Sequence, residues 1–202
     1  MEKYKKQRIA LTFDDGPGEH TERLLDILKS YGARATFFVI GNTLANAPAT
    51  LKRASLEGHE IGNHTLTHSP LSYMTNEVRI SELSETNRAI FEITGKTPTL
   101  CRPPFGDFSD EVGRTGADLG LSFIKWSVDT MDWKSLDSDA VFAVITENAC
   151  DGDIVLCHDV HKTTVDAMER AVPWLTGRGF ELVTVSELLS DKRAGELYHR
   201  AE

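Results

Sequence analysis

Two histidines, His64 and His68, are the first residues of this sequence whose spacing could bind a metal ion. An i, i+4 spacing places two imidazoles on one side of a helical turn, close enough to hold one ion. The residues between them are Thr-Leu-Thr, without the glutamate of the metalloprotease pattern HExxH. A third ligand must therefore come from another segment. The alternative interpretation is an ordinary surface pair.

Two adjacent carboxylates, Asp14 and Asp15, offer that third ligand. They end an apolar stretch just before Gly16-Pro17, a turn that cannot continue a β-ladder. Adjacent residues at a strand end point in opposite directions, so the two carboxylates could take different roles. An Asx turn is the alternative interpretation. A metal with three protein ligands and an open position polarises a carbonyl and lowers the pKa of bound water to about 7, which is hydrolase chemistry.

The elements that must position these residues follow an alternating pattern. Short runs rich in β-branched and aromatic residues alternate with segments of helical period, which is typical of a parallel sheet wrapped by helices. About seven strands are expected, at 8–14, 35–41, 59–64, 100–105, 122–129, 153–159 and 181–185. Amphipathic helices are expected around 24–31, 80–91 and 140–149. Pro173 should split the segment 164–178 into two helices.

Polar residues fall at the carboxyl ends of the expected strands. Besides the two aspartates and His64, these ends carry Arg102, Asp129 and His158. In parallel α/β sheets and barrels the carboxyl ends of the strands meet on one face, and that face carries the chemistry. The sequence therefore predicts one pocket that is shared by residues far apart in the chain.

Composition sets wider limits. A chain of 202 residues with 40% hydrophobic content predicts a single domain, residues 1–202, with a core from about residue 8 to 189. The formal net charge of −9 argues against nucleic acid as a partner. No apolar run approaches the roughly 20 residues of a membrane span, and the opening segment 1–8 has no apolar stretch behind it that would form a secretory signal. A monomer is expected.

The chain has 3 cysteines, Cys101, Cys150 and Cys157, and they lack the spacing of a disulfide framework or of a zinc site. We expect them to be buried packing residues, with Cys157 facing away from the site. The histidines at 20, 59, 161 and 199 are expected on the surface or behind the site.

Several segments occur in a recognisable order: TFDDGP at 12–17, HTLTH at 64–68, RPPFG at 102–106, DTMDW at 129–133 and LCH at 156–158. Together they resemble the motifs of polysaccharide deacetylases of the NodB type, carbohydrate esterase family four. The resemblance runs from about residue 8 to 189 and is strongest to the peptidoglycan-directed members. It implies an α/β fold, a distorted barrel of about seven parallel strands with helices. It also implies an extracytoplasmic location, and the missing signal would make the chain an excised domain.

The resemblance implies a metal site and an acetyl pocket. The metal would be a divalent ion, usually Zn²⁺ with Co²⁺ or another ion as alternatives, and its ligands would be Asp15, His64 and His68. The backbone N–H of Phe105 would stabilise the oxyanion, and Trp133 and Leu156 would form walls of the pocket. The family usually has Tyr where this chain has Phe105, so a substrate contact through a phenolic hydroxyl is in doubt.

The resemblance also implies the acid and base that amide hydrolysis requires. Asp14 resembles the catalytic base, and Arg102 resembles the arginine that pairs with it and favours its charged form. An amine leaves as a very poor anion, so a proton donor is needed, and His158 resembles that general acid. Asp132 resembles the carboxylate that keeps the acid protonated, with Asp159 as the alternative partner.

The leading hypothesis is removal of N-acetyl groups from N-acetylglucosamine units of peptidoglycan or chitin-like oligosaccharides by metal-activated water, with an Asp base and a His acid. An acetylxylan esterase with the same site is the first alternative. A non-haem iron oxygenase is another, because two histidines and one carboxylate also suit Fe(II). An inactive sugar-binding module should lack a ligand or the base, and neither is missing from the sequence.

Overall fold

The computed structural model of the protein describes residues 7–201, so most of the opening segment 1–8 lies outside the described residues. Within them, a 9-stranded sheet has the order β6-β7-β1-β2-β3-β4-β5-β9, and β8 pairs with the start of β1. Every strand pair is parallel. The strands are β1 Arg8–Asp14, β2 Thr36–Val39, β3 Glu60–Asn63, β4 Leu100–Cys101, β5 Ser122–Ile124, β6 Val128–Asp129, β7 Ile154–His158, β8 Glu181–Leu182 and β9 Leu197–Tyr198.

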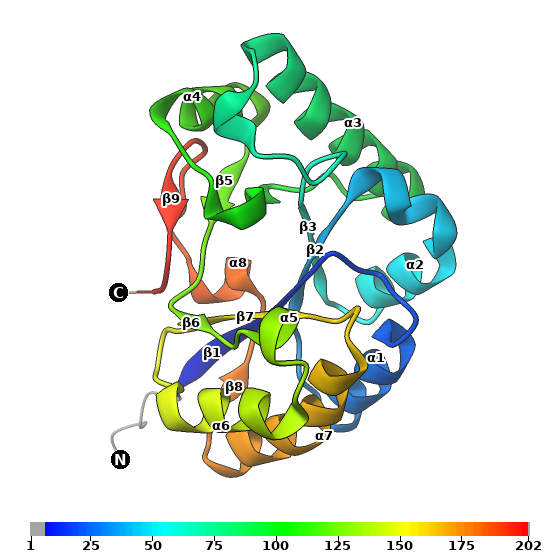
Figure 1. The fold of residues 1–202 in the computed structure, drawn as a ribbon, viewed down its shortest axis with the longest axis vertical. Coiled ribbons are helices and arrows are strands. Elements are labelled where there is room, and N and C mark those ends of the chain that lie inside the picture. Colours follow the sequence, from blue (N-terminus) through cyan, green and yellow to red (C-terminus); the bar gives the residue numbers. More distant parts are fainter. Residues whose placement is uncertain (1–6, 202) are drawn as a thin grey trace.

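Helices surround this curled sheet, as Figure 1 shows. The α-helices are α1 Thr21–Ser30, α2 Pro48–Leu56, α3 Asn76–Thr94, α4 Asp110–Leu119, α5 Asp132–Ser135, α6 Ser138–Asn148, α7 Lys162–Gly177 and α8 Val185–Leu188. Short 3₁₀ turns are η1 Gly41–Asn46, η2 Leu71–Tyr73 and η3 Pro104–Gly106. The predicted fold class, a distorted α/β barrel of parallel strands, is confirmed. Among residues 7–201, no helix combines the length and the apolar character needed to cross a membrane.

The apolar sequence of β1 explains its central place in the sheet. Ile9, Leu11 and Phe13 pack into the cluster that also contains residues of α1 and α7, whereas Ala10 packs into a second cluster. Both faces of the strand are therefore buried, which is the arrangement expected for a parallel strand covered on both sides. Phe13 stacks on Phe37 of β2 with ring centroids 5.4 Å apart.

Six of the seven expected strands are shorter than predicted, and three of them differ by more than two residues at one end. The segment 122–129 divides into β5 and β6, separated by residues 125–127. The strand expected at 100–105 ends at Cys101, because Pro103 and Pro104 have no N–H for the ladder. The strand expected at 181–185 ends at Leu182, and Thr184 then begins α8 with a capping box.

The prediction that Pro173 splits a helix is wrong, because α7 is continuous over Lys162–Gly177. Helix interiors lose about 3 kcal/mol or more at proline. Buried side chains on both sides of Pro173, among them Met168, Val172 and Leu175, pack α7 onto the sheet and α6 and hold the helix together across this position.

A strand that the predicted core of residues 8–189 left out, β9, lies beside β5 at one edge of the sheet (Figure 1). The N–H groups of Phe123 and Lys125 each donate to carbonyls of this segment, at 2.8 Å. Beyond β9, Arg200 forms an antiparallel bridge with Asp153, which directly precedes β7. The segment after residue 190 therefore links β5 to the start of β7.

Candidate active site

A cavity of about 460 Å³ opens at the carboxyl ends of the strands, and we call it the carboxyl-end cavity. It is lined by Asp14, Asp15, His64, His68, Pro103, Phe105, Trp126, Asp129, Trp133, Leu156 and His158. Two of the predicted site residues, Arg102 and Asp132, lie behind this lining and are 0% exposed. The parallel sheet thus brings the predicted site residues to one place.

Three side chains converge as a metal site would require. Nε2 of His64 lies 3.5 Å from Oδ1 of Asp15, and Nε2 of His68 lies 3.4 Å from the same oxygen. The three donor atoms lie within 4.8 Å of one another. Ligands bound to a tetrahedral zinc ion at roughly 2.1 Å are about 3.4 Å apart, so these separations suit one ion.

The orphaned oxygen of Asp15 supports the same assignment. Oδ1 of this residue is buried and has no hydrogen-bond partner among residues 7–201. Nδ1 of His64 lies 2.6 Å from the carbonyl oxygen of Arg102 and would donate its hydrogen to it, leaving the lone pair of Nε2 toward Asp15. Burial lowers the pKa of His64 to about 3, which keeps the imidazole neutral as a metal ligand must be. The donor set therefore fits a divalent metal.

The expected helical turn at the histidine pair is not formed. Residues 64–68 are a loop after β3, and Thr65 and His68 have left-handed φ values of 66° and 58°. Glu82 of α3 holds this loop, because its carboxylate accepts the N–H groups of Leu66 and Thr67 at 2.9 Å. The two rings still meet, with centroids 4.9 Å apart. Sequence reasoning missed Glu82, which lies in the middle of an ordinary amphipathic helix.

The two adjacent aspartates do not point to opposite sides as expected, since both line the cavity. The reason is the φ of 73° at Asp15, which turns the backbone directly after β1. Their neighbours nevertheless differ. Asp14 is buried and pairs with Arg102, whereas Asp15 faces the histidines.

Arg102 is a fully buried ion-pair partner of Asp14, at 2.8 Å. Three further N–H groups donate to Oγ1 of Thr12 at 2.7 Å and to the carbonyls of Ile124 and Lys125 at 3.2 and 2.9 Å. Burial raises the pKa of Asp14 above its ordinary value, and the charge and hydrogen bond of Arg102 oppose this rise. From the sequence, Arg102 was expected to lower the pKa of Asp14. Burial has the larger effect, and the pKa of Asp14 is raised overall.

His158 and Asp132 form the second charged pair. Nδ1 of His158 lies 2.8 Å from Oδ1 of Asp132, whose Oδ2 accepts the hydroxyl of Thr164 at 2.7 Å. Burial alone would lower the pKa of His158, but the hydrogen bond and charge of Asp132, together with the charges of Asp14 and Asp15, raise it to about 9. The alternative partner, Asp159, accepts a hydrogen bond from Thr21 instead.

Apolar side chains form the walls of the cavity. Phe105 is 71% exposed, has a left-handed φ of 59°, and lies edge-on to His68 with centroids 4.9 Å apart. Trp133 is 51% exposed, which excludes an ordinary core position, and Leu156 is buried. Two further lining residues, Trp126 and Asp129, were given no role from the sequence. The position of Asp129 at the carboxyl end of an expected strand could have indicated that it lines the cavity.

The remaining histidines and cysteines only partly follow expectation. His59 is buried, and its Nδ1 accepts the N–H of Ala35 at 3.1 Å, so it is not a surface residue. His161 lies near His158, with ring centroids 6.1 Å apart. All the cysteines are free; Cys101 and Cys157 are buried as expected, but Cys150 is exposed.

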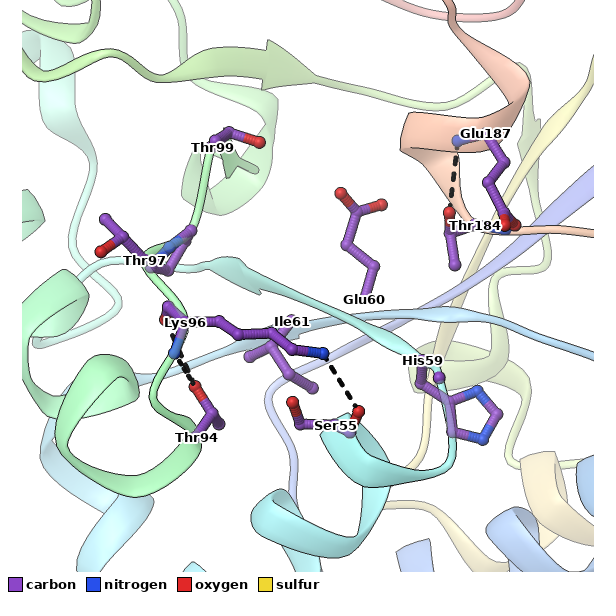
Figure 2. Close-up of a pocket in the computed structure, with 12 residues that line it drawn as sticks. Ser55, His59, Glu60, Ile61, Thr94, Lys96, Thr97, Thr99, Thr184 and Glu187 are labelled. Carbon is purple, nitrogen blue, oxygen red and sulfur yellow. Dashed lines mark hydrogen bonds between the residues drawn. The ribbon is translucent and has the colours of Figure 1, made fainter.

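A second cavity, of about 250 Å³, lies at the amino ends of β3 and β4, and we call it the amino-end cavity (Figure 2). Several of its polar side chains are paired within the protein. Nζ of Lys96 donates to the carbonyl of Ser55 at 3.3 Å, and Oε2 of Glu60 accepts the hydroxyl of Thr36 at 3.1 Å and the N–H of Ser186 at 2.9 Å. Within residues 7–201, no lining residue of this cavity belongs to a group of three potential metal ligands like Asp15, His64 and His68.

Comparison with known proteins agrees with this arrangement. The model of the family described as polysaccharide deacetylase matches residues 1–124. The chain belongs to the polysaccharide deacetylase family. It is 40% identical over 187 residues to the peptidoglycan-N-acetylglucosamine deacetylase PgdA of Listeria monocytogenes, covering 92% of this chain and 40% of that protein. This chain thus spans about 40% of the length of the first curated relatives it matches.

Two further similarities cover most of both chains. A peptidoglycan-N-acetylglucosamine deacetylase of Bacillus cereus is 40% identical over 190 residues, which are 91% of this chain and 89% of that protein. A solved structure described as a T48 deacetylase with substrate superposes with a TM-score of 0.91 at 39% identity, and 96% of each chain is covered. The fold is therefore shared over 96% of this chain with that structure, at 39% sequence identity.

Proposed function

We propose that this chain is one catalytic domain that removes N-acetyl groups from N-acetylglucosamine units of peptidoglycan or chitin-like oligosaccharides outside the cytoplasm, with Zn²⁺ as its metal. The observation that carries the proposal is the convergence of Asp15, His64 and His68 in a cavity that also receives two charged pairs, Asp14 with Arg102 and His158 with Asp132. The names of the relatives PgdA and the Bacillus cereus deacetylase support the substrate class.

The metal would be held by the carboxylate of Asp15 and the Nε2 atoms of His64 and His68. When bound, it supplies Lewis acidity to the acetyl carbonyl and to the attacking water. Asp14 borders this site, with Oδ2 at 3.7 Å from Nε2 of His64, and takes up the proton of the water. Arg102 fixes the orientation of that carboxylate from behind.

The leaving amine receives its proton from His158. A C–O bond forms to the acetyl carbon, the C–N bond breaks, and acetate and a free amine leave. With a pKa of about 9, His158 holds its proton at neutral pH, and Asp132 binds Nδ1 so that Nε2 faces the cavity. The N–H of Phe105 contributes to oxyanion stabilisation, and Trp133 and Leu156 enclose the acetyl methyl group.

The charged pairs argue against an iron oxygenase. An oxygenase needs neither an arginine-paired second carboxylate nor a histidine kept protonated by a buried aspartate, and both are present here. Full activity under argon with added zinc is the expected result, and a requirement for oxygen would contradict the proposal.

A substrate panel tests the function. Acetate release is measured on N-acetylglucosamine oligomers, on peptidoglycan and on acetylated xylan, before and after chelation and after return of Zn²⁺. We expect release from the N-acetylated substrates that is lost on chelation and restored by Zn²⁺. Activity confined to acetylated xylan would assign an acetylxylan esterase, and activity that survives chelation would defeat the metal site.

A further inference from the structure

A buried carboxylate, Asp159, lies behind the turn that carries Asp15 and takes part in none of the steps above. It directly follows His158 at the end of β7, and its side chain is 0% exposed. Its Oδ1 is buried without a hydrogen-bond partner among residues 7–201. Burying a carboxylate costs free energy unless it forms hydrogen bonds within the protein. A buried carboxylate such as Asp159 is therefore expected to have a structural role, which its contacts should reveal.

A chain of hydrogen bonds connects Asp159 to the turn after Asp15. The hydroxyl of Thr21, the first residue of α1, donates to Oδ2 of Asp159. The same hydroxyl oxygen accepts the N–H of Gly18 at 2.8 Å. Thr21 is 1% exposed, so water does not compete for either bond. Asp159 thus fixes the distal end of the turn formed by residues 15–18.

The carboxylate also packs against the middle of that turn. A Cβ atom added at Gly16 would collide with both carboxylate oxygens of Asp159. A Cβ added at Gly18 would meet Val160, the next residue along, at 3.0 Å. The end of β7 and the turn are therefore in direct contact, and no side chain fits between them.

The turn needs such support because of the conformation of Asp15. A left-handed φ of 73° costs a residue with a side chain about 1–2 kcal/mol, and it persists only where its surroundings fix it. The N–H of Asp15 donates to the carbonyl of Phe38 at 3.1 Å, which holds the proximal end of the turn. The distal end is held through Thr21.

We propose that Asp159 is a positioning residue for Asp15, holding the turn of residues 15–18 in the conformation that brings the Asp15 carboxylate to both histidines. The proposal rests on the proposed function, since it takes Asp15, His64 and His68 as metal ligands. The same carboxylate follows the acid His158 in the chain, so it joins the metal side of the cavity to the acid side.

The test measures the dissociation constant of Zn²⁺, by competition of the metal-free protein with a chromophoric chelator. Thr21→Val and Asp159→Ala should weaken Zn²⁺ binding by about 10–100-fold, the usual effect of losing a residue that orients a ligand. Thr21→Ser keeps the hydroxyl and should bind Zn²⁺ like the wild type. Asp159→Asn keeps an acceptor oxygen for Thr21, so its affinity for Zn²⁺ should lie between those of the wild type and Asp159→Ala.

Two controls separate positioning from stability. Thr115→Val removes another buried threonine hydroxyl, bonded to Asn76 on the α3 and α4 side of the molecule, and should leave Zn²⁺ binding unchanged. Melting temperatures are measured for every variant. If Thr21→Val and Asp159→Ala lower the melting temperature but bind Zn²⁺ like the wild type, the role is structural and the inference is overturned.

A variant at a proposed ligand distinguishes the two proposals. His68→Ala removes a proposed ligand and should abolish tight Zn²⁺ binding. If His68→Ala binds Zn²⁺ like the wild type, or if the wild type does not bind Zn²⁺, the metal site itself is refuted. The proposed role of Asp159 is then refuted as well. If Asp159→Ala does not fold, the pair Thr21→Val and Thr21→Ser decides.

Discussion

The two cavities at opposite ends of the sheet both contain polar side chains, but they differ in how these polar groups are satisfied. At the amino end, Glu60 and Lys96 bond to neighbouring protein groups, and His59 accepts a backbone N–H. At the carboxyl end, a buried oxygen of Asp15 has no partner within residues 7–201, and the pKa of His158 is raised to about 9.

This difference shows which polar cavity should carry chemistry. Buried polar groups that bond to one another stabilise a fold, whereas a buried acceptor without a partner among residues 7–201, such as Oδ1 of Asp15, indicates a site for a ligand. Volume alone would not separate the two cavities as clearly. The comparison predicts that changes at the carboxyl end affect turnover and that changes at the amino end affect stability.

The largest effect is expected for His68→Ala. With one of three ligands removed, deacetylation should fall to background, a greater loss than the roughly 10²- to 10⁴-fold typical of a general acid or base. The measurement is kcat/KM on an N-acetylglucosamine oligomer, with zinc content determined in parallel. If His68→Ala kept both its zinc and its activity, the carboxyl-end cavity would no longer be distinguished from the amino-end cavity as the site of chemistry.

The next effect is expected for His158→Ala. Loss of the proton donor should reduce kcat on an N-acetylated oligomer by about 10²- to 10⁴-fold, and less on an activated acetyl ester, whose leaving group needs less protonation. The measurement is kcat on both substrates, with zinc content unchanged. Equal losses on amide and ester would contradict a role in protonating the amine.

A moderate effect on pH dependence is expected for Asp132→Asn. His158 is protonated below a pKa of about 9, so kcat of the wild type should fall as the pH rises through that value. Removing the charge of Asp132 should move this alkaline limb to lower pH by about 1–3 units. A pH profile of kcat tests this, and an unmoved limb would assign it to another group.

The same pair links pH to stability. The pKa of His158 is higher in the folded protein than the ordinary 6.5, so its contribution to stability is fully present below pH 6.5 and is lost as the pH rises through about 9. Asp132→Asn should flatten this dependence in denaturant titrations.

At the amino end, His59→Leu should affect stability alone. The N–H of Ala35 loses its buried acceptor, which should lower the free energy of unfolding by about 1–3 kcal/mol. kcat of the folded variant at saturating substrate should equal that of the wild type. Urea denaturation and steady-state kinetics test this, and a lower kcat would show coupling between the two ends of the sheet.

The smallest effect is expected for Lys96→Met. The lysine makes one long hydrogen bond, to the carbonyl of Ser55, so the free energy of unfolding should change by no more than about 0.5 kcal/mol. Deacetylation should be unchanged. A marked loss of activity would mean that the amino-end cavity takes part in function.

Much of the site could be predicted because a parallel sheet collects strand ends on one face. Asp14, His64 and His158 end or follow strands that periodicity identifies, and the sheet register then makes them neighbours. Local sequence could not give the left-handed φ of Asp15 or the loop after His64. Those conformations depend on contacts distant in sequence, such as the carboxylate of Glu82.

The fold could be predicted in class but not in detail, for the same reason. β9 has only two residues, and its strand conformation depends on pairing with β5. Pro173 locally opposes a helix, yet burial on both sides maintains α7. The pKa of Asp14 also depended on burial, which the residue types around it do not reveal.

The position of β9 has a consequence for how the protein is made. Arg102 donates to carbonyls of residues 124 and 125, at the end of β5, and β9 forms its hydrogen bonds to this same stretch. During translation the first strand leaves the ribosome long before β9 does. The surroundings of the arginine behind Asp14 are therefore complete only when β9, the last described strand, has paired with β5.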